Sequence, residues 1–261
     1  MASPFLRKAL RAELDVAHVN GLWTHRIGST FFPDGRKFES VYSNLGLWKT
    51  QAQEYTSQTK EFWLKHYIPR EGDVIIDVGA GRGEDTLTFS RAVGNTGRVV
   101  AIEASPLSFA MLQTFCLLNG MSNVTALQVA LMDKPGTVRL LEDESSWTED
   151  SVVRGDESIG IEVQSTSLGE IWRQQGLKEV AFLKMNIEGG ERHALLGTES
   201  VLPYVSHICV ACHDFRSDSG DGEHFRTRAF VHEFLGKQGF FVTSNLGDPR
   251  PYVRDHVFGT K

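Results

Sequence analysis

The stretch VIIDVGAGRGE, residues 74–84, is the most informative part of this sequence. A compact apolar run, 74–78, leads directly into a loop with glycines at positions 79, 81 and 83, and a helical pattern follows over 86–93. Glycine lets the backbone turn sharply and approach a ligand closely, and the first turn of a helix presents free N–H groups. The stretch therefore predicts a buried strand, a ligand-binding loop and a helix.

Apolar runs and helical patterns alternate along the rest of the chain. The predicted strands are 98–102, 124–129, 137–141, 163–166, 180–185, 207–211 and 240–244, and the predicted helices are 108–118, 166–175, 191–201 and 226–238. This alternation is typical of an α/β, doubly wound, mostly parallel sheet covered on both faces. Cys209 and Cys212 should lie on opposite faces of one strand, which favours free thiols over a zinc site.

Residues 1–69 differ in character, and we predict an N-terminal extension, acting as a cap or dimerisation lobe, ahead of a domain over 70–261. An amphipathic helix is expected over 1–17, a β-hairpin over 27–42 around the PDG turn at 33–35, and a helix over 51–67. Seven aromatic residues of this region are more typical of core but allow a stacking pocket: Trp23, Phe31, Phe32, Tyr42, Trp48, Tyr55 and Trp63.

The composition is ordinary for a globular enzyme, with 41% apolar residues among 261. The 27 basic and 33 acidic residues give a net charge of -6 and form no basic run, which argues against a nucleic-acid partner and favours a small-molecule substrate. No segment reaches the roughly 18 apolar residues of a membrane span, and the N-terminus lacks a signal-peptide core. We therefore expect a cytoplasmic location and no membrane partner.

Two acids indicate the kind of cofactor. The GxGxG spacing differs from the GxGxxG of dinucleotide enzymes, and Asp77 stands two residues before its first glycine. An acid there would repel a diphosphate but attract S-adenosylmethionine, which carries a sulfonium and an ammonium group. Glu103, at the tip of the next strand, can accept both hydroxyls of a ribose. These residues favour S-adenosylmethionine, and an NAD-binding oxidoreductase is the alternative of another class.

Five segments together resemble the FkbM family of methyltransferases. They are DVGAGRGEDTL (77–87), VVAIEASPLSFAML (99–112), VTALQVAL (124–131), VAFLKMNIEGGERHALLG (180–197) and HICVACHDF (207–215). The resemblance implies a seven-stranded Rossmann-like fold and methyl transfer from S-adenosylmethionine, mainly to hydroxyls of sugars and secondary metabolites. It also implies which residues contact the cofactor: Asp77, Gly79 and Gly81 at the methionine end, Thr86 near its carboxylate, Glu103 at the ribose, Ala104 and Ala130 at the adenine, and in addition Ala80, Ser105 and Asn186.

The fourth segment departs from the family where Asn186 replaces an acid. The amide keeps an acceptor but loses the charge, which weakens a general-base or metal-ligand role, and we predict no metal. Asn186, Glu188 and His213 are the predicted catalytic residues, with His213 as a base of near-neutral pKa. Purely structural roles stay open for Glu188, which is expected to pair with Lys184, and for His213.

The methyl acceptor stays open at this level. The hydroxyl of a sugar or secondary metabolite is the first prediction, and methylation at carbon or nitrogen of an aromatic, indole-type natural-product precursor is the alternative. A non-catalytic cofactor-binding module is a third possibility because of Asn186. A homodimer through the N-terminal lobe is possible.

Overall fold

The computed structural model describes residues 14–38, 56–141, 151–152 and 160–261. A seven-stranded sheet lies at its centre, in the order β13-β14-β12-β11-β4-β5-β6. Its strands are β4 (Val74–Val78), β5 (Arg98–Glu103), β6 (Val124–Gln128), β11 (Val180–Met185), β12 (Val205–Ala211), β13 (Phe241–Ser244) and β14 (His256–Thr260). Pairing is parallel from β12 to β6, whereas β14 runs antiparallel to β12 and β13. The predicted mostly parallel Rossmann-like sheet is confirmed; β14 was not predicted.

Helices and the side chains beneath them bury both faces of this sheet. The helices are α3 (Glu84–Val93), α4 (Pro106–Leu118), α5 (Leu168–Gln175), α6 (Glu191–Leu196), α7 (Asp214–Asp218), α8 (Arg228–Lys237) and α9 (Pro251–Arg254). Cys209 packs in the apolar cluster that contains Ile75, and Cys212 packs in the cluster that contains Ile76. The two free thiols therefore lie on opposite faces, as the strand alternation predicts.

A three-stranded antiparallel sheet precedes the central domain: β1 (Leu14–Val19), β2 (Leu22–Ile27) and β3 (Thr30–Gly35). The predicted turn at 33–35 is wrong, because these residues end β3. The turns fall at residues 20–21 and 28–29 instead. Asn20 and Gly21 have φ of 53° and 77°, the left-handed conformation that a two-residue hairpin turn requires.

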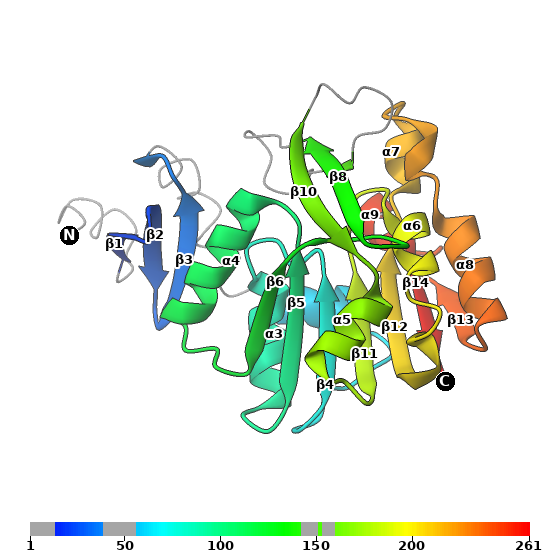
Figure 1. The fold of residues 1–261 in the computed structure, drawn as a ribbon, viewed down its shortest axis with the longest axis horizontal. Helices are drawn as coiled ribbons and strands as arrows, with labels where there is room; N and C mark the ends of the chain where they lie inside the picture. The colour runs from blue at the N-terminus through cyan, green and yellow to red at the C-terminus, as the bar shows by residue number, and fades with distance from the viewer. Residues whose placement is uncertain (1–13, 39–55, 142–150, 153–159) are drawn as a thin grey trace.

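The N-terminal sheet packs against α4 (Figure 1). Asn119 at the end of α4 accepts from the Phe31 N–H and donates to the Phe31 carbonyl, both at 2.9 Å. Residues 14–17 lie in β1 rather than in the predicted helix, and residues 1–13, Tyr42, Trp48 and Tyr55 lie outside the described residues.

Residues 56–62 are helical, and the chain that follows packs on the central sheet. Trp63, Leu64 and Tyr67 lie in the same buried cluster as Ile75 and Phe182. This segment therefore shares the core of the downstream domain, and the division at residue 70 stays a prediction.

A second, smaller sheet has the order β7-β10-β8-β9 (Figure 1). It contains β7 (Ala130–Leu131), β8 (Gly136–Leu141), β9 (Ser151–Val152) and β10 (Ile161–Thr166). The strands predicted at 137–141 and 163–166 thus exist but do not join the central sheet. Among the described segments, no helix combines the length and apolar character needed to cross a membrane.

Candidate active site

Two adjoining cavities open at the carboxyl ends of the parallel strands, where ligands bind in folds of this kind. The first, of about 380 Å³, lies over the ends of β4, β5 and β11. The second, of about 460 Å³, lies beside the end of β12 and reaches α7 and α9. The residues that line both are Phe62, Trp63, Asn186 and Glu188. The two cavities therefore share part of their walls.

Most residues predicted to contact the cofactor line the first cavity: Gly79, Ala80, Gly81, Glu103, Ala104, Ala130 and Asn186. Three predicted residues, Asp77, Thr86 and Ser105, are absent from the lining. Thr86 donates to Asp77 at 2.6 Å, and Ser105 caps α4 by accepting from the Ser108 N–H at 3.4 Å. The structure therefore gives these three residues supporting contacts beneath the cavity.

Asp77 is fully buried and paired with Lys184, whose Nζ lies 2.9 Å from Asp77 Oδ1. Burial acts to lower the pKa of Lys184, but Asp77 and Asp85 outweigh it and raise that pKa. Lys184 also donates to the Gly79 carbonyl at 2.8 Å. Asp77 is therefore held by Lys184 behind the cavity lining, and its contact with the cofactor stays a prediction. The predicted pairing of Lys184 with Glu188 is also wrong.

The described lining of the first cavity nevertheless has an acidic balance. Acids outnumber bases four to two: Glu84, Asp85, Glu103 and Glu188 against Arg82 and Lys184. Asp85 lies beside the same lysine as Asp77, with Lys184 Nζ 3.7 Å from Asp85 Oδ2, so one cation faces two acids here. Burial raises the pKa of Asp85, which indicates a carboxylate that gains from a cationic neighbour. The lining thus fits a cationic ligand better than a diphosphate.

Glu103 is oriented by two backbone donors. Its Oε2 accepts from the Gly81 N–H and its Oε1 from the Ser105 N–H, both at 2.8 Å. A carboxylate oxygen can accept more than one hydrogen bond. The geometry therefore suits the predicted contact with two ribose hydroxyls.

Gly79 is where the loop after β4 meets the loop after β11. Its φ is 70°, and a Cβ there would lie 1.8 Å from the Asn186 carbonyl oxygen. We expect Gly79→Ala to lower the free energy of unfolding by about 2–4 kcal/mol and to abolish cofactor binding, because the two loops would have to move apart.

Gly120→Ala is the control, since Gly120 has φ 64° but open space around it. Urea unfolding and calorimetry with S-adenosylhomocysteine measure both effects; equal losses in the two variants would contradict the steric explanation.

His213 is held between two carboxylates. Its Nε2 lies 3.0 Å from Glu188 Oε1, and its Nδ1 lies 2.9 Å from Glu191 Oε1. Burial acts to lower the pKa of His213, but hydrogen bonds to Glu188 and Glu191 raise it to about 10. His213 is therefore an imidazolium at neutral pH and has no free nitrogen to accept a proton. This differs from the prediction of a base with a near-neutral pKa.

Glu188 presents an ionised carboxylate where the two cavities meet. Burial acts to raise its pKa, but hydrogen bonds from His213 and Arg216 outweigh this and lower it. Arg216 Nη1 lies 3.1 Å from Glu188 Oε2. Glu188 also has φ 46°, a strained conformation for a residue with a side chain, and such strain clusters at functional sites. Glu188 therefore stays ionised at the junction of the cavities, held there by His213 and Arg216.

The sequence allowed Trp63 either a core position or a stacking role, and it gave no role to several other residues at the site. Trp63 lies between Lys184 Nζ, 5.0 Å from the ring centroid, and the stacked ring of His256 at 4.6 Å. Phe215, Arg216 and Tyr252 line the second cavity. The polar loop after the strand at 207–211 was the one available signal for Arg216.

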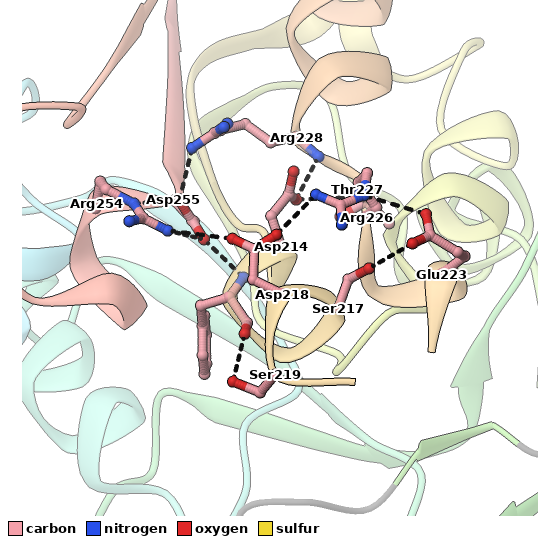
Figure 2. A network of polar contacts seen from close by, with 11 residues as sticks. Asp214, Ser217, Asp218, Ser219, Glu223, Arg226, Thr227, Arg228, Arg254 and Asp255 are labelled. Atoms are coloured by element: carbon pink, nitrogen blue, oxygen red, sulfur yellow. Dashed lines mark hydrogen bonds and ion pairs between the residues drawn. The ribbon is translucent and has the colours of Figure 1, made fainter. Parts of the chain in front are cut away.

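A polar network holds the α7 wall of the second cavity against α8 and α9 (Figure 2). Asp214 accepts from the backbone N–H groups of Thr227 and Arg228, at 3.0 and 2.9 Å. Asp255 accepts from the Phe215 N–H at 3.0 Å. The backbone around His213 is therefore fixed from both sides.

Within the described ranges, no group of three or more His, Cys, Asp or Glu side chains is placed to hold a metal ion. Metal independence stays a prediction, since it concerns the reaction itself.

Comparison with known proteins places the site in a family. The family model of the methyltransferase FkbM domain matches residues 77–241, more than half of the chain. No curated protein matches the chain.

Among solved structures, the chain is similar to the methyltransferase FkbM from Methylobacillus flagellatus KT, at 15% identity over 85% of this chain and 60% of that one, with a TM-score of 0.49. This chain thus spans less than two thirds of that relative. It is also similar to cofactor-bound Rv0187 from MTB, at 10% identity over 80% of this chain and 79% of that one, with a TM-score of 0.51. The second similarity supports the fold.

Proposed function

Because this chain belongs to the FkbM family of S-adenosylmethionine-dependent methyltransferases, we propose that it methylates a hydroxyl of a small molecule, such as a sugar or secondary metabolite. The observation that carries the proposal is the ionised carboxylate of Glu188 where two cavities meet. A hydroxyl acceptor needs a proton acceptor at this point. Because the chain belongs to this family, we no longer propose an NAD-binding oxidoreductase or a non-catalytic module.

The first cavity is the proposed cofactor site. The backbone of residues 79–81 would hold the methionine end, with Asp85 as its acidic partner, and Glu103 would bind the ribose. Ala104 and Ala130 line the part assigned to adenine. When bound, S-adenosylmethionine supplies an electrophilic methyl group on a sulfonium.

The second cavity is the proposed acceptor site. Glu188 accepts the hydroxyl proton, while His213 and Arg216 each hold one of its oxygens, leaving a second lone pair on each for the acceptor. Asn186 lines both cavities and can orient the acceptor with its side-chain amide. The protein contributes mainly alignment of the acceptor atom and removal of its proton.

An aromatic acceptor is the second candidate. The rings of Phe62, Trp63, Phe215 and Tyr252 line the second cavity, which favours binding of a planar molecule. Such an acceptor could be methylated at carbon or nitrogen. Four further points stay predictions: a small-molecule acceptor, a cytoplasmic location, a possible homodimer, and the absence of nucleic-acid and membrane partners.

Transfer of a labelled methyl group tests the proposal. The protein is incubated with methyl-labelled S-adenosylmethionine and two acceptor panels, one of glycosides and aliphatic alcohols and one of indoles and phenols. We expect label on oxygen, located by mass spectrometry. The Gly79→Ala protein is the negative control. Label found on carbon or nitrogen alone would overturn the hydroxyl proposal.

A further inference from the structure

Glu191 is a fully buried carboxylate outside both cavities. Its Oε1 accepts from the Gly189 N–H at 3.1 Å and from His213 Nδ1 at 2.9 Å. Its Oε2 accepts from Thr227 Oγ1 at 3.1 Å. One side chain therefore connects the turn after β11, the end of β12 and the start of α8.

The turn that Glu191 holds is the one that carries Glu188. Glu188 and Gly189 have φ of 46° and 88° in succession. A Cβ on Gly189 would lie 3.0 Å from the Phe225 ring, so the turn is also closely packed. Strained backbone persists only where its surroundings compensate for it, and a hydrogen bond to a carboxylate is among the stronger compensations.

The same carboxylate balances the charge around His213. The acids that bond to this ring are Glu188 and Glu191, and Arg216 reaches it through Glu188. His256 also faces His213 and is neutral, because burial lowers the pKa of His256 to about 4. Asp214 follows in the chain and is occupied by α8 backbone donors. Glu191 is thus the partner that keeps the ring charged while Glu188 accepts a proton.

We propose that Glu191 is a positioning residue for methyl transfer: its buried carboxylate fixes the Glu188 turn and holds His213 as the cation that orients Glu188. This inference rests on the proposed function, in which Glu188 accepts the acceptor's proton. Glu191 itself touches neither ligand site.

The test compares Glu191→Gln with two matched variants. Glu191→Gln keeps the shape and removes the charge, so we expect kcat to fall about 10–100-fold, the loss associated with one buried charged hydrogen bond. Binding of S-adenosylhomocysteine should change less than about twofold, and NMR should show His213 losing its proton at lower pH than in the wild type. Glu233→Gln, in an exposed pair with Lys237, is the control and should match the wild type.

Thr227→Val keeps the Glu191 charge and removes one donor to it. We expect a kcat loss of only about 2–10-fold, with His213 still protonated at neutral pH. If Glu191→Gln does not fold, this variant decides, and an unchanged kcat would overturn the proposal. A folded Glu191→Gln protein with wild-type kcat and an unchanged His213 titration would also overturn it.

A failure of the proposed function can be distinguished from a failure of the Glu191 proposal. If the wild type methylates no hydroxyl, that function fails, whereas the His213 titration still reports whether Glu191 holds the ring.

Discussion

Glu188→Gln is expected to lower kcat by about 10²–10⁴-fold, the range that a general base contributes, while S-adenosylhomocysteine binds as before. The amide keeps the length of the side chain but cannot accept the acceptor's proton. It also ends the ion pairs with His213 and Arg216. Single-turnover kinetics with labelled cofactor separate this chemical loss from a loss of binding.

The control for this variant is Glu170→Gln on α5, which removes a carboxylate from a surface pair with Arg173. Its turnover should equal that of the wild type. If Glu188→Gln turned over at the wild-type rate, Glu188 would not be the proton acceptor, and the assignment of the second cavity would lose its chemical basis.

Lys184→Met is expected to lower the free energy of unfolding by about 3–5 kcal/mol, because it leaves the Asp77 carboxylate buried and unpaired. Methionine has a similar length and apolar stem, so the loss comes mainly from the charge. The Lys184 bond to the Gly79 carbonyl is lost as well, which should weaken cofactor binding. Urea denaturation followed by circular dichroism measures the stability.

A double variant separates charge from packing. Lys184→Met combined with Asp77→Asn removes both charges of the closest pair and should recover part of the lost stability, because only Asp85 then lacks its lysine neighbour. Lys237→Met, in the exposed pair with Glu233, should change stability by less than about 1 kcal/mol. A Lys184→Met loss no larger than that of Lys237→Met would contradict a structural role for the buried pair.

Much of the proposed cofactor site followed from the sequence. Gly79, Gly81 and Glu103 line the first cavity as predicted, because the ends of neighbouring parallel strands meet at one edge of a sheet. The strand predictions succeeded where apolar runs are continuous, as in β4 and β11. The predicted hairpin turn at 33–35 is wrong because these residues end strand β3. Asn20 and Gly21 form a hairpin turn instead, as expected for an Asn-Gly pair.

The sequence by itself determined the class of fold and pointed to the location of the proposed cofactor site, since both depend on periodicity and on glycines within short segments. The tertiary structure alone decided which charges meet. Lys184 pairs with Asp77, and Glu188 and Glu191 keep His213 protonated. These partners are too far apart in the sequence for a local pattern to predict that they meet. A pKa depends on neighbours in space and on burial, so a proton acceptor could be proposed for this site only once those partners were placed.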